Sequence, residues 1–517
     1  MRDGAQSVDV NFSLQDKLRI TSKLDEFGVA FVEGGWPGSN PKDEEYFKRA
    51  IDLPLKNAEV VAFGSTRKNG IESSADKNLN AIVDSGVRVA TIFGKTWDLH
   101  VTTVLNTTLE SNVEMVYDSV KYLKEHGLRV IFDAEHFYDG YLNNKKYAMA
   151  AIEAAFEAGA ERIVLCDTNG GTLPHAFQTI TGEVIASLNA PIGIHCHNDS
   201  GTAVANSLLG VMVGATHVQG TINGIGERCG NADLCQIIPA LELKMGISTS
   251  KLGKERLKSL RMLSLYVYEV LQMRPNSHQP YVGENAFAHK GGVHVDAMLK
   301  NNVAYEHIDP ASVGNLRLIS VSELSGKANI LAKAKEFGLE IEKGSPVVTK
   351  LLEKIKEMEY KGYQLEGADG SLYLLISKEL GIHRRLFDVA QWRTISDSRD
   401  QSFAAESSIK VRVGAREIYV IAEGNGPVNA QDMALRKAMS EFFPEIDKIQ
   451  LVNYKVSIAE TAEGTASTVR TFIEFSDGES HWITVGVSTN ILEASKVALI
   501  DGYDYYLQTI HKSSSAQ

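Results

Sequence analysis

The sequence predicts an α/β protein whose first part is an eight-fold β/α (TIM) barrel lacking its first strand. Between about residues 28 and 220, short apolar or β-branched runs alternate with helical patterns, which indicates a parallel sheet. Helical patterns rich in Lys, Leu and Glu follow, and a hairpin-and-helix pattern then occurs twice. We therefore expect a catalytic barrel over residues 1–250, a helical connector over 251–385, and an α+β domain of duplicated ββα halves over 390–517.

The barrel elements can be followed in order along the chain. A helix comes first, because Ser13 is a suitable N-cap for apolar residues that recur with helical spacing up to Gly28. Seven strands follow, each with a helical pattern after it, at residues 29–32, 60–63, 88–92, 130–133, 162–166, 191–195 and 217–221. Because eight helices accompany seven strands, we expect the native reading frame to start upstream of Met1. An open barrel, or a miscounted strand, is the alternative.

The last part of the chain contains an internal duplication. Residues 409–422 form a predicted hairpin, and the helix after it starts at Asn429. Residues 468–487 form a second hairpin, and its helix starts at Asn490. Each Asn has an acidic residue three positions on, an arrangement that can cap a helix start. Such a pair of halves suits a regulatory domain with a pocket or dimer surface between them; a purely structural oligomerisation domain is the alternative.

Composition narrows the class of protein. The chain has 517 residues, 44% of them hydrophobic, and a net charge of -12, which argues against nucleic acid or an anionic membrane as the main partner. Its four cysteines form no CxxC pair, which is typical of a reducing cytosol. Neither a signal peptide nor a membrane span is recognisable in the sequence. We therefore expect a cytoplasmic enzyme that acts on small molecules.

Polar residues gather where the predicted strands end. In β/α barrels the chemistry lies at the carboxyl ends of the strands. Glu33 and Glu135 lie at or just past two such ends, residues 167–169 follow a third, His195 closes a fourth, and residues 223–231 follow the last. Their recurrence in strand after strand predicts an active site at this rim of the barrel.

A divalent-metal site is predicted at the same rim. His195 and His197 are two residues apart at the end of a strand, so both imidazoles point to one face. Asp3 can add a carboxylate and Asn231 an amide oxygen. This ligand set suits Mg²⁺, Mn²⁺ or Zn²⁺ and leaves positions open for a chelating α-keto acid.

Three further residues are candidates for the chemistry. Arg2 can stabilise an oxyanion on a polarised ketone, unless it forms only a surface salt bridge. Glu135 is a candidate acid–base group, although buried carboxylates also serve structure. Thr168 can donate to a substrate carboxylate, unless it only caps a helix. The glycine-rich residues 223–231 lack the context of a dinucleotide loop, so we expect them to let the backbone turn closely over the metal.

Taken together, residues 2–6, 194–199 and 224–231 resemble the family of Claisen-condensing, metal-dependent barrels. That family contains isopropylmalate, homocitrate and citramalate synthases and, as lyase relatives, hydroxymethylglutaryl-CoA lyases. The resemblance covers nearly the whole chain, including the duplicated C-terminal part. The citramalate synthase branch is resembled most closely at residues 33–40, 132–138 and 166–174.

The resemblance implies roles for particular residues. It implies that the metal-associated residues are Asp3, His195, His197 and Asn231. It implies that Arg2 polarises the keto acid and that Glu135 is a catalytic carboxylate. His294 and Tyr305, in the connector, are implied to complete the site, reaching across to the barrel of a partner subunit in a homodimer. Family members have an aspartate and threonines on a strand before Arg2; that strand is absent here, so the sequence does not fix the geometry of Asp3.

The implied reaction joins acetyl-CoA to pyruvate and hydrolyses the thioester to give citramalate and CoA. Isoleucine is the expected effector of the C-terminal domain, because the product lies on its pathway in this family. A 2-isopropylmalate synthase, which takes 2-oxoisovalerate, is the nearest alternative. A lyase or aldolase, or an inactive truncated chain that only binds an amino acid, are the others.

Overall fold

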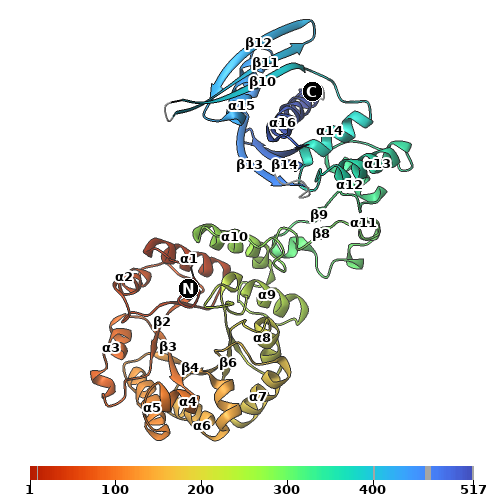
Figure 1. The fold of residues 1–517 in the computed structure, drawn as a ribbon. Coiled ribbons are helices and arrows are strands. Elements are labelled where there is room, and N and C mark those ends of the chain that lie inside the picture. Colours follow the sequence, from red (N-terminus) through yellow and green to blue (C-terminus); the bar gives the residue numbers. More distant parts are fainter. Residues whose placement is uncertain (9, 400–401, 460–466, 515–517) are drawn as a thin grey trace. The chain divides into compact units, whose positions relative to one another are not determined.

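The computed structural model describes residues 1–8, 10–399, 402–459 and 467–514, which form two compact units (Figure 1). Unit 1 consists of Met1–Phe287 and Ile308–Leu316. Unit 2 consists of Ala288–His307 and Arg317–Gln517. The boundary between the units therefore lies inside the predicted connector.

Unit 1 is built on a seven-stranded parallel sheet in which each strand pairs with the strand before it in the chain. The strands are β1 (Phe31–Gly35), β2 (Glu59–Ser65), β3 (Val89–Lys95), β4 (Arg129–Glu135), β5 (Arg162–Asp167), β6 (Ile192–Cys196) and β7 (His217–Gln219). Each predicted strand overlaps one of these strands, so the predicted barrel with seven strands is confirmed.

Helices surround this sheet (Figure 1). They are α1 (Leu14–Phe27), α2 (Pro41–Ala50), α3 (Lys77–Asp84), α4 (Asp98–Thr103), α5 (Leu109–Glu125), α6 (Phe137–Glu157), α7 (Pro174–Ser187), α8 (Ala203–Met212), α9 (Leu234–Pro239) and α10 (Leu260–Val270). The first helix begins as predicted, because the Ser13 side chain accepts from the amide of Asp16 while the Asp16 carboxylate accepts from the amide of Ser13. It ends at Gly28, whose φ of 86° is left-handed.

The alternation of side chains along β4 shows how the sheet positions the site. Phe132 is fully buried in the layer between the sheet and the helices. Ile131 is buried instead in a second cluster with Val61, Val89 and Val164, on the opposite face of the sheet. Because side chains alternate in a strand, Asp133 and Glu135 share the face of Ile131. The polar residues at the strand ends therefore lie next to this apolar cluster, on the same face of the sheet.

The sheet has two edges, β1 and β7, and each pairs with one neighbour only among the described residues. A cavity of about 480 Å³ lies between them, lined by residues 29–33 and 216–221. Apolar side chains of α1 and α9, including Leu24, Leu234 and Ile237, also line this cavity. The gap agrees with the prediction of a barrel that lacks one strand.

Unit 2 contains most of the predicted connector after residue 287, and this part is mainly helical, as predicted. Its elements are β8 (Ala288–His289), α11 (Gly292–Lys300), β9 (Leu318–Ile319), α12 (Lys327–Glu336), α13 (Pro346–Tyr360) and α14 (Asp369–Glu379). The two-residue strands β8 and β9 pair in parallel and join the first residues of unit 2 to a later part of the connector.

The C-terminal part contains the predicted hairpins and helices, with one additional strand before each hairpin. The first half comprises β10 (Asp388–Arg399), β11 (Ser402–Val413), β12 (Arg416–Gly424) and α15 (Pro427–Met439). The second comprises β13 (Gln450–Ile458), β14 (Val469–Ser476), β15 (His481–Ser488) and α16 (Ile491–Ser514). Each half forms its own antiparallel three-stranded sheet. Most side chains of the extra strand β13 are exposed.

The two predicted caps have different outcomes. Asn490 caps α16, since its side chain accepts from the amides of Leu492 and Glu493 at 2.9 and 3.4 Å. The Asn429 prediction is wrong, because α15 already begins at Pro427 and the Asn429 side chain accepts from the amide of Asn425 instead. Proline is favourable in the first turn of a helix, and here it sets the earlier start.

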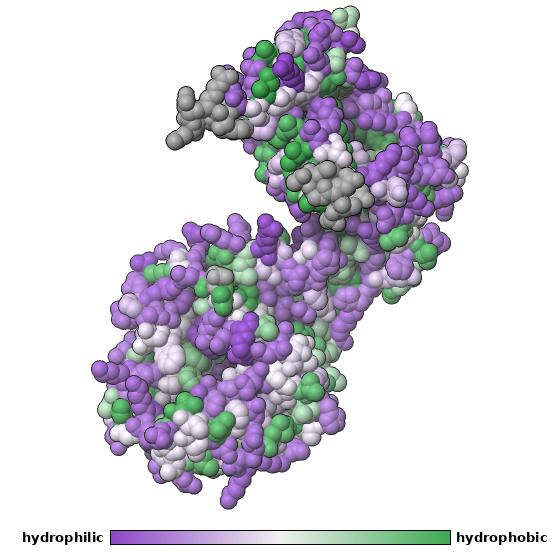
Figure 2. Space-filling model, viewed as in Figure 1, coloured by the Kyte–Doolittle hydropathy of each residue, from purple (hydrophilic) through white to green (hydrophobic). Residues whose placement is uncertain are grey.

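Hydrophilic residues cover most of the surface seen in Figure 2, with apolar residues scattered among them. Among the described residues, no helix combines the length and the apolar character needed to cross a membrane. Several exposed apolar side chains belong to the outer strands of the C-terminal sheets: Tyr419, Ile421, Val452 and Ile458.

Candidate active site at the carboxyl ends of the strands

The two predicted histidines lie together at the end of β6. His195 is in the strand and His197 follows it, and their rings stack with centroids 5.2 Å apart. Both are buried. An isolated bridge pairs His197 with Asn231, which brings the loop after β7 onto the same rim. The expected common face of the two imidazoles is therefore present.

Asp3 reaches the same place from the start of the chain. The amide of Arg2 donates to the carbonyl of Glu33 at 3.2 Å, which anchors this segment to the end of β1. The Asp3 carboxylate lies 3.0 Å from Nε2 of His195, and that nitrogen is 3.1 Å from Oδ1 of Asn231. The end of β1 thus supplies the support for Asp3 that the sequence left open.

This group is suited to a divalent cation. Ligand atoms of Asp3, His195 and His197 lie within 4.8 Å of one another. Two buried atoms, Oδ1 of Asp3 and Nδ1 of His197, have no hydrogen-bond partner among the described residues. A cation is the partner that a buried carboxylate oxygen and a neutral imidazole nitrogen share. The residues present therefore fit a metal ion, while the ligand types leave Mg²⁺, Mn²⁺ and Zn²⁺ open.

Electrostatics favour a positive charge at this point. Burial would lower the pKa of His195, but its hydrogen bond to Asp3 and the charges of Asp3 and Asp133 outweigh burial and raise it to about 9. Burial and the neighbouring His195 lower the pKa of His197 to about 4, so that its ring is neutral and its lone pair free. Burial opposes ionisation of Asp3, but Arg2 and His195 outweigh it and lower the pKa of that carboxyl.

Two polar residues that sequence reasoning missed orient His195. Its Nδ1 lies 2.6 Å from Oε1 of Gln219, and the amide group of Gln219 donates to Asp133 at 2.9 Å. Such outer contacts fix the tautomer and the direction of a metal-binding imidazole. Burial raises the pKa of Asp133 to about 7. Asp133, Cys166 and His195 form a second close group of potential ligand atoms, which shares His195 with the first.

Arg2 stands at the mouth of the site. Its Nε donates to Glu33 at 2.7 Å, and its Nη1 lies 3.6 Å from Asp3. The guanidinium carbon is 3.7 Å from the centre of the Phe63 ring, so one face of the group is covered. These contacts hold the Arg2 guanidinium beside Asp3.

Glu135 ends β4, and Thr168 follows directly after the neighbouring strand β5. Glu135 forms an ion pair with Lys95, the last residue of β3. Thr168 accepts from the amide of His136 at 2.9 Å, so its hydroxyl lies next to the segment that carries Glu135. His136 has a φ of 56°, a strained turn that redirects the chain immediately after Glu135.

The glycine-rich loop over the site approaches Asn231 closely. The φ values of Gly224 and Gly230 are +66° and +93°, and the Asn231 amide donates to the carbonyl of Gly224 at 2.8 Å. A Cβ on Gly226 would lie 2.1 Å from Nδ2 of Asn231. The expectation that these glycines allow a close turn at the site agrees with this geometry.

His294 and Tyr305 belong to unit 2, whereas the residues described above belong to unit 1. The two rings stack on each other with centroids 4.4 Å apart. Tyr305 is 45% exposed, and His294 is also exposed, on α11. The structure therefore brings these two residues to each other within unit 2.

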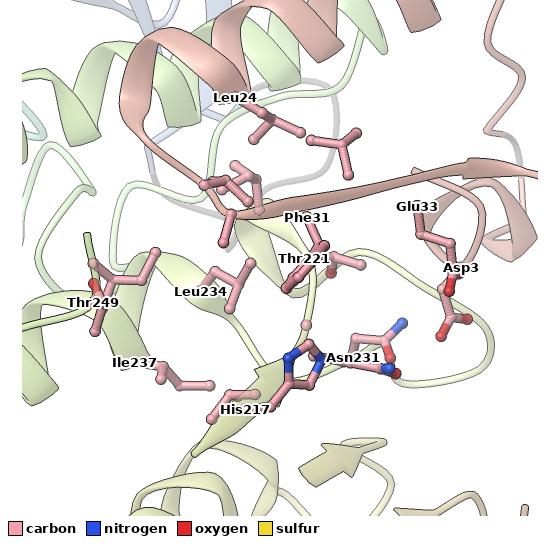
Figure 3. Close-up of a pocket in the computed structure, with 18 of the residues that line it drawn as sticks. Asp3, Leu24, Phe31, Glu33, His217, Thr221, Asn231, Leu234, Ile237 and Thr249 are labelled. Atoms are coloured by element: carbon pink, nitrogen blue, oxygen red, sulfur yellow. The ribbon is translucent and has the colours of Figure 1, made fainter. Parts of the chain in front are cut away.

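Figure 3 shows the cavity between β1 and β7. Asp3, Glu33 and Asn231 lie on one side of it, whereas Leu24 and Ile237 lie farther away. The polar group at the strand ends therefore borders an apolar cavity that runs between the outer strands.

Comparisons with known proteins place each part of the chain. The family model described as HMGL-like matches residues 1–263, the one described as homocitrate synthase post-HMGL domain-like matches 281–362, and the LeuA allosteric (dimerisation) domain matches 366–507. The strand-end site lies in the first of these regions.

Three relatives match over almost their whole length. The (R)-citramalate synthase of Sulfolobus acidocaldarius is 50% identical, with 98% of this chain and 96% of the relative covered. The (R)-citramalate synthase of Geobacter sulfurreducens is also 50% identical, with 100% and 97% covered. The 2-isopropylmalate synthase of Methanocaldococcus jannaschii is 31% identical, with 98% and 93% covered. The chain therefore belongs to the HMGL-like family and, within it, to the group of (R)-citramalate synthases.

Proposed function

We propose that the site at the carboxyl ends of the strands condenses acetyl-CoA with pyruvate and hydrolyses the resulting thioester, giving citramalate and CoA. The chain is by its family an acyltransferase that converts the acyl group to an alkyl group on transfer. The observation that carries the proposal is the close group of Asp3, His195 and His197 beside Arg2. As a soluble biosynthetic enzyme it is expected in the cytoplasm and to feed isoleucine synthesis.

The metal would be held by Asp3, His195, His197 and Asn231. A divalent cation bound there supplies Lewis-acid polarisation and a template for a chelating keto acid. Arg2 stabilises the negative charge that develops on the ketone oxygen, because its guanidinium is already fixed by Glu33 and needs no reorganisation. Thr168 donates to the carboxylate of pyruvate.

Proton transfer is assigned to Glu135, at the end of β4, together with His294 and Tyr305. A carboxylate positioned at a strand end can accept a proton from the methyl group of acetyl-CoA or activate water. Kinetic measurements on single variants of Glu135, His294 and Tyr305 would show which of them abstracts the proton and which activates water.

The proposal is tested by release of free thiol from acetyl-CoA with a panel of keto acids. We expect release with pyruvate, loss of release after treatment with a chelator, and recovery on adding back a divalent metal. A D3N variant should need more metal for the same rate, because an amide oxygen is a weaker ligand than a carboxylate. A preference for 2-oxoisovalerate would favour the 2-isopropylmalate synthase alternative, and thiol release that a chelator does not affect would refute the metal site.

A homodimer with shared sites is the second part of the proposal. The LeuA dimerisation domain supports a dimer, and His294 and Tyr305 would act on the barrel of the partner subunit. At limiting metal, where D3N is expected to have little activity, D3N and H294N should then regain activity when mixed as a heterodimer, because one intact barrel meets one intact connector. Absence of recovery in a verified heterodimer would contradict this arrangement.

Inhibition by isoleucine through the C-terminal domain is the third part. The allosteric domain that matches residues 366–507 supports regulation by a small molecule. Isoleucine should inhibit the full chain, and deletion of the residues from about 390 onward should abolish that inhibition. Inhibition that survives the deletion would place the effector elsewhere.

A further inference from the structure

Lys95 is brought to Glu135 by the pairing of β3 with β4. The two residues are direct partners in the parallel register and each is the last residue of its strand. Their side chains leave the sheet on the same face, and the Lys95 ammonium forms an ion pair with Oε2 of Glu135. Only 16% of the Lys95 side chain and 23% of the Glu135 side chain are exposed. The pair is therefore sheltered, unlike the exposed ion pairs on the outer helices.

The Lys95 ammonium contacts an aromatic ring and a carboxylate. The ring of Phe93 lies on one side, with its centre 5.5 Å from Nζ. Glu135 is the carboxylate that pairs with Lys95 among the described residues. His136, the neighbour of Glu135, has its own carboxylate partner, Asp139, at 3.1 Å. Lys95 is thus the charged group that faces the Glu135 carboxylate.

The backbone beneath the pair is fixed at both strand ends. The carbonyl of Lys95 accepts from Nδ2 of Asn112 at 2.9 Å and from the hydroxyl of Tyr147 at 3.1 Å. Asn112 is fully buried. Thr96 donates its amide and its hydroxyl to the carbonyl of Glu135, at 3.2 and 2.8 Å. With both backbones held, the ion pair determines only where the carboxylate points.

We propose that Lys95 is a positioning residue that fixes the orientation of the Glu135 carboxylate for its acid–base step. The inference rests on the proposed role of Glu135. A sheltered ion pair adds little to stability, because the cost of removing both charges from water offsets their attraction. A misplacement of about 1 Å in a catalytic group can cost about 100-fold in rate. Orientation of Glu135 is thus the larger effect of this pair.

The test compares K95M, K95R, E135Q and the double variant K95M/E135Q. Methionine keeps the length of the side chain and removes the charge. We expect K95M to lower kcat by about 10- to 100-fold with KM for pyruvate and acetyl-CoA within about twofold, and K95R to recover part of the loss. In the E135Q background K95M should lower kcat no further, because Lys95 acts through Glu135.

Two controls keep the result interpretable. K145M removes an exposed lysine that pairs with Glu183 between two outer helices, and should leave kcat unchanged. Thermal unfolding of every variant reports on folding, and K95Q replaces K95M if the latter does not fold. A further loss of kcat by K95M in the E135Q background, or an unchanged kcat in K95M, would overturn the positioning role alone. Wild-type activity in E135Q would overturn the proposed role of Glu135 and this inference with it.

Discussion

Substitution of Gly226 by alanine is expected to disturb the metal site through one contact. The new Cβ would lie 2.1 Å from Nδ2 of Asn231, and real Cβ contacts stay above 3.0 Å, so the amide group must retreat by about 0.9 Å. The neighbouring contacts, 3.1 Å to Cγ and 3.3 Å to the amide nitrogen of Asn231, are also tight. The φ of Gly226 is not in the left-handed region, so alanine adds no backbone strain. The effect of G226A should therefore fall on Asn231.

The expected size follows from the place of Asn231 in the site. Displacing a residue that holds or orients a metal ligand typically costs about 10- to 100-fold in metal affinity or activity, which is about 1.4 to 2.7 kcal/mol. We expect G226A to bind metal more weakly by such a factor in calorimetric titration of the metal-free protein. Its rate of thiol release should approach that of the unsubstituted chain as metal is raised.

A matched control is available nearby. Gly171 follows β5, and a Cβ there would meet nothing within 4 Å. G171A should leave metal affinity unchanged, and thermal unfolding should confirm that both variants fold. Equal metal affinity in G226A and G171A would refute the assignment of Asn231 to the metal site.

Three further expectations concern single groups. Burial and the positive charges near it lower the pKa of His217 to about 4, so between pH 6.5 and 4 this histidine takes up a proton only in the unfolded chain. As the pH falls through this range, the free energy of unfolding should decrease by at most about 3 kcal/mol. Urea titrations of H217Q should show a smaller decrease. T168V should raise KM for pyruvate and remove the hydroxyl that accepts from the His136 amide at 2.9 Å. T168S retains a hydroxyl, so it should keep both this hydrogen bond and the KM of the unsubstituted chain. Metal binding at pH 7 should release a proton from His195, which calorimetry in buffers of different ionisation enthalpy measures.

Each expectation has a contradicting result. An H217Q protein whose stability varies with pH as in the unsubstituted chain would show that His217 is not the titrating group. An unchanged KM for pyruvate in T168V would remove Thr168 from the substrate site. Metal binding without proton release would mean that the His195 nitrogen is already neutral at pH 7.

The strands of unit 1 could be predicted because buried parallel strands leave continuous apolar runs in the sequence. Their ends were less well defined. The first strand was predicted at 29–32 but continues to Gly35. Its end could not be predicted, because Gly34 and Gly35 carry no strand signal. The third was predicted to end at residue 92 but extends to Lys95, whose polar side chain belongs to the site and not to the core. In the C-terminal part, β13 was not predicted, although Tyr454, Val456 and Ile458 alternate with polar residues.

The site could be predicted only in part, and the division has a physical cause. Metal-binding residues are recognisable because their types and positions at strand ends follow from coordination chemistry. Gln219, Asp133 and Lys95 act by orienting other side chains, and a single polar residue in a strand carries no sequence signal of that role. Gln219 contacts His195 on the neighbouring strand β6, 24 positions away, and Asp133 on β4, 86 positions away, so only the folded sheet identifies these partners.

The balance of charge explains why these outer residues belong to the function as much as the ligands do. Asp3 and Asp133 both act to raise the pKa of His195 against the effect of burial, and Gln219 passes the influence of Asp133 to the ring. The surrounding groups therefore favour a positive charge near Nε2 of His195, which a proton or a metal ion can supply. Arg2 supplies only part of this positive charge: its Nη1 lies 3.6 Å from Asp3, while Glu33 engages its Nε. A keto acid that contacts Arg2 would therefore lie beside a group of side chains that favours a cation. The proposed metal ligands, the residues that orient them and the substrate contact thus depend on one another.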